Sequence, residues 1–330
     1  MSAVTTTARI ITWQRRAAVE LRAGDTTAIV VPELGMVIAS FVVDGTEFVA
    51  RPGGLSAYSA GHTTAIPLLY PWANRLARAS YRASGSNISL RGLLLHRDGN
   101  GLPIHGTMTA RPEWEITALG RAALRARFGF DAHADLLASF PFPHELVVKV
   151  RVAPGRLRVI TEVHASAGVA VPVAFGWHPY WRLPGGRDSW SLALPAVSHL
   201  GLNRRGIPTG RACDELADEV VLAGREFDDL YHLTGPRSMT LTGGRRKLKV
   251  DFDRGYPYLQ VYAPAEGEFC CLEPMTAPTN GLVTGDHPSV GPGAMFSAAF
   301  TATVSHPRAH RSGVNPVPNT APVDARTARR

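Results

Sequence analysis

Apolar and polar residues alternate with a period of two at many places along the chain. The clearest example is the pair of segments Leu146–Val152 and Leu157–His164, in which valine and leucine alternate with charged residues. A period of two is typical of a half-buried β-strand. The turn-forming residues Ala153–Arg156 separate the two segments, so the pattern predicts a β-hairpin.

The same alternation, or a short apolar run bounded by turn residues, predicts further strands. They are Thr26–Val31, Met36–Val43, Trp114–Leu119, Leu124–Phe130, Leu259–Tyr262, Phe269–Leu272 and Met295–Val304. Helical periodicity is scarce, and Ala212–Ala223 is the best candidate for a short helix. Because strands do not alternate with helices, a doubly wound parallel sheet is disfavoured. The pattern therefore predicts an all-β protein, a large antiparallel sandwich or barrel with few short helices.

The composition agrees with many short strands joined by turns. Glycine (32 residues) and proline (25 residues) are frequent and scattered over the 330 positions, and 45% of the residues are hydrophobic. An all-β sandwich can exceed about 200 residues as one domain, so the length does not require two. We expect a single domain over residues 9–305, a flexible N-terminus over 1–8 and a disordered basic tail over 306–330.

The formal net charge of +8 does not indicate a nucleic-acid partner. Residues 306–330 contain five arginines and one aspartate, so half of the excess lies in the predicted tail and the other 305 residues carry only about +4. The densest basic cluster, Arg245–Lys249, follows two glycines and alternates into Val250. It predicts the solvated start of a strand after a hairpin turn rather than a phosphate-binding site.

The cysteines and the N-terminus bear on the cellular setting. An odd number of cysteines, two of them adjacent (Cys213, Cys270 and Cys271), indicates reduced thiols rather than a disulfide framework. The first residues lack a basic stretch followed by an apolar one, and no window of 18 apolar residues occurs. We expect a cytoplasmic protein without a membrane partner, either a monomer or a homodimer.

Two short stretches combine acid–base groups with aromatic or apolar neighbours. His178 stands among aromatic residues in Phe175–Leu183, and Glu273 lies in Leu272–Thr276; a proline follows each of them directly. A residue before proline is disfavoured in the helical region, so both side chains are expected on extended backbone or at strand ends. Histidine and glutamate can move protons to and from sugar oxygens, while aromatic rings cover the apolar faces of a pyranose.

Other catalytic motifs are missing from the sequence. It contains no Gly-x-Ser-x-Gly elbow, no P-loop and no Gly-x-Gly-x-x-Gly fingerprint. It also lacks His-Glu-x-x-His and paired Cys-x-x-Cys motifs, so a zinc site is not indicated. A glycosidase needs two carboxylates that flank the scissile bond, and only Glu273 has such a setting. The lack of a second such carboxylate disfavours hydrolysis of a glycosidic bond.

Several motifs occur in a fixed order along the chain. They are Val31–Ser40 with Asp44-Gly45, Leu69–Leu76, Pro103–Gly106, Phe175–Tyr180, Phe227–Tyr231, and Tyr258–Tyr262 followed by Leu272–Thr276. These motifs and their order over residues 25 to 304 resemble the aldose 1-epimerase (galactose mutarotase-like) family. The resemblance implies a supersandwich fold and an enzyme that interconverts the α and β anomers of a free aldohexose such as glucose or galactose. It implies no cofactor and no metal.

The resemblance also implies roles for individual residues. Glu273 would be the general base and His178 the general acid that open and close the sugar ring. The other matching positions imply substrate-binding residues, namely Arg75, His105, Asp228, Gln260, Asn74 as a brace for Arg75, and Trp177 or Tyr180 as a ring that stacks on the sugar. Asp229 is the alternative to Asp228, and the spacing leaves open which aromatic residue points to the substrate.

The sequence departs from the galactose mutarotases at two points, in the residues before Asn74-Arg75 and at residues 178–180. Residues 178–180 read His-Pro-Tyr, which resembles divergent bacterial epimerase-like proteins and the hexose-6-phosphate mutarotases rather than the His-Thr-Tyr form. Four arginines lie near the motifs but form no obvious phosphate site: Arg78, Arg82, Arg97 and Arg182. A free aldohexose is therefore the preferred substrate. A hexose-6-phosphate mutarotase and a non-catalytic carbohydrate-binding or sensor protein are the alternatives.

Overall fold

The computed structural model describes residues 4–306 of the chain. Strands dominate, as the alternating pattern predicted, and antiparallel pairing joins them into sheets. The three short α-helices of this part of the chain are α1 (Gly54–Ser59), α2 (Ala134–Ser139) and α3 (Gly281–Thr284), and three 3₁₀ turns lie at Pro32–Leu34, Phe130–Ala132 and Arg187–Ser189. None of the helices in residues 4–306 is long and apolar enough to cross a membrane. The all-β prediction is confirmed.

The largest sheet has nine strands in the order β19-β16-β21-β22-β26-β12-β11-β10-β9. In that order the strands are Asp218–Val221, Ser191–Leu194, Ser238–Gly243, Arg246–Arg254, Met295–Ser305, Arg156–Ala165, His144–Ala153, Ala123–Gly129 and Glu115–Gly120. The predicted hairpin is β11 and β12, which pair from His144↔Ala165 to Ala153↔Arg156. The basic cluster at 245–249 lies at the hairpin turn between β21 and β22, also as predicted.

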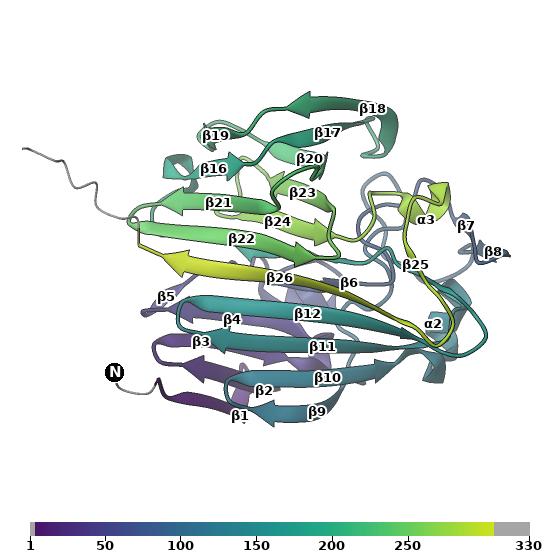
Figure 1. Ribbon diagram of the computed structural model, residues 1–330, viewed down its shortest axis with the longest axis horizontal. Helices are drawn as coiled ribbons and strands as arrows, with labels where there is room; N and C mark the ends of the chain where they lie inside the picture. Colours follow the sequence, from purple (N-terminus) through teal and green to yellow (C-terminus); the bar gives the residue numbers. More distant parts are fainter. Residues whose placement is uncertain (1–3, 307–330) are drawn as a thin grey trace, which may run out of the picture.

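Two further sheets lie against the nine-stranded one (Figure 1). One has five strands in chain order: β1 (Thr6–Trp13), β2 (Arg16–Ala23), β3 (Thr26–Val31), β4 (Val37–Val43) and β5 (Thr46–Glu47). The other has the order β18-β17-β20-β23-β24-β14-β6, and β15 also pairs with β24. These strands are Pro208–Glu215, Val197–Leu202, Phe227–His232, Tyr258–Ala263, Cys270–Met275, Gly176–Trp177, Leu68–Leu69 and Tyr180–Trp181 (β15).

One continuous apolar core joins the three sheets. It contains valines of β11 and β12, Phe41 of β4, and Trp177 and Leu272 of the eight-stranded sheet, all essentially inaccessible to solvent. In Figure 1 the strands β1 to β4 lie behind β9 to β12, while several short elements gather with α2 and α3 at one end of the molecule. These include β7 (Ser80–Ala83), β8 (Ser86–Ser89), β13 (Val171–Pro172) and β25 (Ser289–Val290).

Two predictions about elements differ from the structure. The predicted helix at Ala212–Ala223 is wrong, because these residues belong to β18, β19, the segment between them and the two positions after β19. Both strands lie at sheet edges and are largely exposed, so no buried face imposes a period of two on their sequence. Strand β1 begins at Thr6, inside the segment 1–8 that was expected to be flexible. The predicted tail lies outside the described residues from position 307 on.

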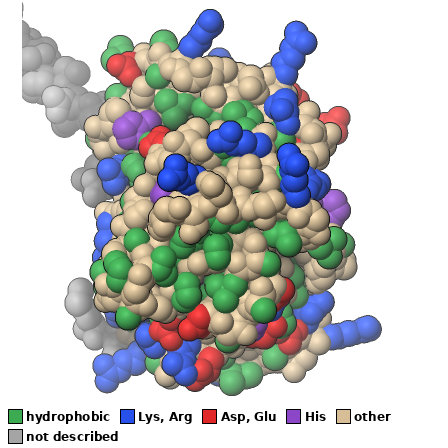
Figure 2. Space-filling view, turned by 90° about the vertical axis from the view of Figure 1, so that its right-hand side faces the viewer, with side chains coloured by type: hydrophobic (Ala, Val, Ile, Leu, Met, Phe, Trp, Pro, Cys, Tyr) green, Lys and Arg blue, Asp and Glu red, His purple; other side chains and the backbone are tan. Residues whose placement is uncertain are grey.

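The end of the molecule where the loops gather carries charge of both signs (Figure 2). Lysine and arginine side chains are spread over its upper part and its lower rim, and acidic side chains gather near the lower rim. Hydrophobic side chains occupy the middle of this view. This face therefore presents no continuous stripe of one charge.

Candidate active site

The candidate site lies on the eight-stranded sheet, where the short strands β14 and β15 both pair with β24. Gly176 pairs with Met275 and Tyr180 pairs with Cys271, so the register is the same on both sides of the interruption at His178-Pro179. That common register places His178 opposite Glu273. On the other side of β24, Glu273 pairs with Gln260 of β23. The segment between β14 and β15 and the strands β23 and β24 thus bring together side chains that are up to 95 positions apart in the sequence.

Strand geometry decides which of these side chains reach the cavity. Successive side chains of a strand point to opposite faces of the sheet, whereas residues opposite each other on neighbouring strands share a face. His178, Glu273 and Gln260 therefore lie on one face, and Tyr180, two residues after His178, lies on the same side. The lining of the cavity agrees with this pattern, since it includes all four side chains.

Trp177 does not reach the cavity, so its predicted alternative role in stacking on the sugar is not possible in this structure. Its side chain lies on the core face, fully buried, with the ring against Phe300 and with Nε1 donating to Oγ1 of Thr161 at 3.0 Å. Because Trp177 directly precedes His178, the period of two sends the two side chains in opposite directions.

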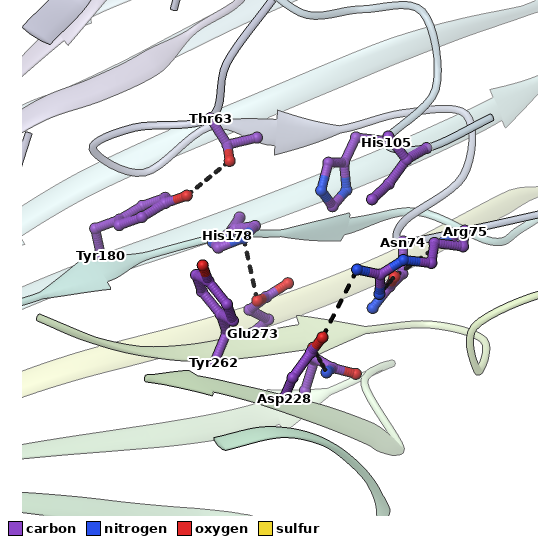
Figure 3. A pocket seen from close by; sticks show the side chains of 11 residues that line it. Thr63, Asn74, Arg75, His105, His178, Tyr180, Asp228, Tyr262 and Glu273 are labelled. Carbon is purple, nitrogen blue, oxygen red and sulfur yellow. Dashed lines mark hydrogen bonds and ion pairs between the residues drawn. The ribbon is translucent and has the colours of Figure 1, made fainter. Parts of the chain in front are cut away.

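The proposed acid–base pair is in contact. Nε2 of His178 lies 3.2 Å from Oε1 of Glu273, and their side chains are only 7% and 2% exposed (Figure 3). The second carboxylate oxygen of Glu273 and Nδ1 of His178 have no hydrogen-bonding partner among the described residues. A proton can pass directly between two such groups, or between either group and a ligand oxygen in the cavity.

Burial moves both groups of this pair towards their neutral forms. Burial lowers the pKa of His178 to about 3. Burial raises the pKa of Glu273 well above its usual range; the nearby carboxylate of Asp228 adds to that shift and the guanidinium of Arg75 opposes it. In the free site both shifts thus favour a neutral imidazole and a protonated carboxyl group.

Arg75 is held by acidic and polar partners on several sides. Its Nε donates to Oδ2 of Asp98 at 2.8 Å, and its Nη1 donates to Oδ1 of Asn74 at 3.1 Å. Its Nη2 lies 3.6 Å from Oδ2 of Asp228 on β20 (Figure 3). Asn74 thus lies where the brace for Arg75 was expected, and it also lines the cavity. Asp98 was not singled out from the sequence.

The structure separates the two aspartates of β20. Asp228 lines the cavity and accepts a hydrogen bond from Nε2 of Gln260 at 2.7 Å. Asp229 faces the opposite side of the sheet, where its Oδ1 lies 3.2 Å from Nε2 of His199. The choice of Asp228 over Asp229 follows from the same alternation that removes Trp177 from the cavity.

Several aromatic rings surround His178. The ring of Tyr180 stacks on it, with centroids 4.6 Å apart, while His105 and Tyr262 meet it edge to face. Burial, together with the nearby His178 and Arg75, lowers the pKa of His105 well below its usual value, so this side chain is neutral. It can donate or accept one hydrogen bond in the cavity.

Three residues that line the cavity were not predicted from the sequence: Thr63, Ile104 and Tyr262. Tyr262 follows Gln260 by two positions on β23, so the alternation of the strand could have identified it. Thr63 lies in a loop, and its contact is a hydrogen bond of 2.7 Å with the hydroxyl group of Tyr180. The sequence around Thr63 contains no signal for that contact.

The cavity is small and polar, with a volume of about 190 Å³. Sites for drug-sized ligands are usually larger, about 300–1,000 Å³, so the size suits a small polar molecule. Arg75 is the only lysine or arginine among the described residues that line it. The four arginines considered for a phosphate site (Arg78, Arg82, Arg97 and Arg182) do not line it.

A sequence profile, a related protein and several solved structures match most of this chain. The sequence profile described as aldose 1-epimerase matches residues 17–291. The uncharacterized protein YihR of Escherichia coli K12 is 25% identical over 281 residues, which cover 81% of this chain and 86% of that protein. The Slr1438 protein of Synechocystis sp. PCC 6803 has a similar structure, with a TM-score of 0.74 and 22% identity over 92% of this chain and 99% of that one.

Two further solved structures share the fold. A galactose mutarotase-like protein of Clostridium acetobutylicum superposes with a TM-score of 0.77 at 15% identity, covering 92% of this chain and 99% of that one. A galactose 1-epimerase of Lactobacillus acidophilus superposes with a TM-score of 0.73 at 12% identity and with the same coverage. At these identities the similarity establishes the supersandwich fold.

Proposed function

The chain belongs to the aldose 1-epimerase family, and from this premise we propose that it interconverts the α and β anomers of a free aldohexose such as glucose or galactose. The reaction is an acid–base opening and closure of the sugar ring. The observation that supports it most strongly is the 3.2 Å contact between His178 and Glu273 at the wall of a small polar cavity.

In the proposed reaction Glu273 removes the proton from the anomeric hydroxyl group while His178 delivers a proton to the ring oxygen. The bond between C1 and the ring oxygen then breaks and gives the free aldehyde. Rotation about C1–C2 and closure on the other face produce the opposite anomer as the two protons return. The total number of protons on the pair is one before and after the reaction, so the cycle needs no other proton donor.

The reactive protonation state has an ionised Glu273 and a protonated His178. Burial disfavours that state in the free site, because it separates charge in a region of low polarity. Sugar hydroxyl groups that donate to the carboxylate stabilise its ionised form, and so does the guanidinium of Arg75. Substrate binding and proton transfer are thereby coupled.

The other lining residues supply hydrogen bonds for a neutral polyol. Asp228 accepts protons from hydroxyl groups, and Gln260 fixes its carboxylate through the 2.7 Å hydrogen bond. Arg75, next to Asp228, and His105, next to His178, can donate to other sugar oxygens. We assign Tyr262 to the apolar face of the ring, because Tyr180 already stacks on His178.

Polarimetry tests this proposal directly. Freshly dissolved α-glucose and α-galactose should reach anomeric equilibrium faster with the protein than in buffer, in proportion to protein concentration. Glucose 6-phosphate in the same assay tests the alternative substrate class. If the wild-type protein binds sugars but accelerates none of these reactions, the proposed activity is wrong and a carbohydrate-binding or sensor function takes its place.

A further inference from the structure

Asp98 contacts the Nε end of the Arg75 guanidinium, whereas Asp228 lies near its Nη2. Its Oδ2 accepts the Nε–H of Arg75 at 2.8 Å, and only 8% of its side chain is exposed. Asp98 is not among the residues that line the cavity. It can therefore influence a bound sugar only through Arg75.

The loop that carries Asp98 fixes the carboxylate independently of Arg75. Oδ1 of Asp98 accepts the backbone N–H groups of Asn100 and Leu102, both at 2.9 Å. The backbone of Asp98 also closes a turn, since Gly101 donates to its carbonyl oxygen and its own N–H donates to Leu102. A carboxylate held this way is a rigid partner for the guanidinium. Burial alone would raise the pKa of Asp98, but the two amide hydrogen bonds and Arg75 together keep that pKa below the usual range.

Contacts on the remaining sides complete the orientation of the guanidinium. Asn74 accepts a hydrogen bond from Nη1 of Arg75. Gly206 packs against the same nitrogen so closely that a Cβ atom at position 206 would lie only 2.8 Å from it. Nε and Nη1 are thus occupied or covered. Nη2, which lies 3.6 Å from Asp228, keeps donors for a ligand oxygen (Figure 3).

Asp98 also balances the charge of Arg75. The guanidinium lies between two carboxylates, Asp98 at 2.8 Å and Asp228 at 3.6 Å, and it is the only fixed cation of the cavity lining in the described part of the chain. A phosphate or other anionic group would meet a cation whose charge is already offset. A neutral hydroxyl or ring oxygen needs only the directed N–H donors, which remain.

We propose that Asp98 is a positioning residue that makes Arg75 a hydrogen-bond donor for uncharged sugars and prevents it from acting as an anion-binding site. This inference rests on the proposed function and narrows its substrate class to neutral aldoses. Asp98 contributes the selectivity, although it does not touch the substrate.

The test compares three variants with the wild-type protein. Asp98→Asn removes the charge, Asp98→Glu keeps the charge but displaces it, and Asp98→Ser keeps an acceptor for the loop amides. Glu47→Gln is a matched control. Like Asp98, Glu47 accepts hydrogen bonds from two backbone N–H groups with one oxygen, those of Phe41 and Val49, and from an arginine with the other, Arg51 at 2.9 Å. Glu47 does not line the cavity.

The readouts are kcat/KM for glucose and the affinities for glucose, glucose 6-phosphate and inorganic phosphate from NMR titration. For Asp98→Asn and Asp98→Ser we expect kcat/KM for glucose to fall about 10-fold to 100-fold, the range for loss of a hydrogen bond to a charged group. The preference for glucose over glucose 6-phosphate should fall by about 10-fold. Asp98→Glu should keep that preference. Glu47→Gln should change neither kcat/KM for glucose nor the preference for glucose over glucose 6-phosphate.

The pH profile supplies a readout that a purely structural role would not change. The charged or titratable side chains around Glu273 are Arg75, His105, His178, Tyr180, Asp228, Tyr262 and Cys271. Arg75 favours the ionised form of Glu273, so removing the charge of Asp98 should strengthen that effect and move the alkaline limb of kcat/KM to lower pH.

An unchanged sugar-to-phosphate affinity ratio in folded Asp98→Asn and Asp98→Ser would overturn the inference, and so would an equal change in Glu47→Gln. Failure of the proposed function gives a different result. In that case the wild-type protein would not accelerate mutarotation, while the affinity ratios would still test the role of Asp98.

Discussion

The imidazole of His178 and the phenol ring of Tyr180 lie parallel, with centroids 4.6 Å apart and planes inclined by 5°. The hydroxyl group of Tyr180 is fixed by Thr63 at 2.7 Å. One face of the tyrosine ring is therefore occupied by the proposed general acid. Tyr180 holds His178 in place more directly than it could bind a sugar.

Substitutions of Tyr180 should separate these two roles. Tyr180→Phe keeps the stacked ring and loses only the hydrogen bond to Thr63, so we expect kcat to change less than about 3-fold. Tyr180→Leu removes the stacking, worth about 0.5–1.5 kcal/mol for an aromatic pair, and should lower kcat by about 10-fold with little change in KM. Steady-state polarimetry measures both. A rise in KM with unchanged kcat would assign Tyr180 to sugar binding instead.

Tyr262 should show the opposite pattern. It lines the cavity and is partly exposed, and its ring meets His178 only at an edge. Tyr262→Ala should raise KM for glucose by about 10-fold through loss of the apolar contact, while Tyr262→Phe should stay within about 3-fold of the wild-type value. Sugar affinity from NMR titration provides the check. Equal KM values for all three proteins would contradict the assignment.

Trp177 should matter for stability and not for turnover. Trp177→Phe loses the hydrogen bond to Thr161 and leaves a small cavity in the core, so we expect the free energy of unfolding to fall by about 2–3 kcal/mol. Activity per folded molecule should be unchanged. Urea denaturation and polarimetry on the same preparations measure the two quantities. Trp13→Phe, at a partly exposed position, is the control and should cost less than about 1 kcal/mol.

The pH dependence of kcat/KM should be a broad plateau. The active free enzyme holds one proton on the His178–Glu273 pair. A second proton must bind to His178, whose pKa is lowered to about 3, so the acid limb should lie near pH 3. Loss of the single proton requires ionisation of Glu273, whose pKa is raised, so the alkaline limb should lie well above the usual glutamate range. A single limb near pH 6.5, the value of an ordinary histidine, would contradict this assignment.

Much of the fold could be predicted because strands with one buried face leave a period of two in the sequence. Thr26–Val31 matches β3 exactly as predicted from its apolar run, and the hairpin of β11 and β12 was placed to within a few residues. The edge strands β18 and β19 could not be predicted in this way. Their residues are mostly exposed, so their sequence reflects no core, and only pairing with β17 and β16 makes them strands.

The candidate site was predictable where its residues lie in motifs and unpredictable where they meet only through folding. The alternation of side chains along a strand could alone have excluded Trp177, which is one position from His178 and so points to the other face. It could also have included Tyr262, which is two positions from Gln260 and so points to the same face. Thr63 and Asp98 could not be found. Each lies in a loop, and its partner, Tyr180 or Arg75, is reached through tertiary contacts that the local sequence does not encode.

The most direct test of the central claim is exchange spectroscopy between the α and β anomers of glucose, by NMR, with wild type, Glu273→Gln, His178→Asn and the double variant. Each single variant should lose about 10²–10⁴-fold in exchange rate while still binding glucose, and the double variant should lose little more, because the two side chains act as a unit. Exchange at the wild-type rate in either single variant would contradict proton transfer by this pair.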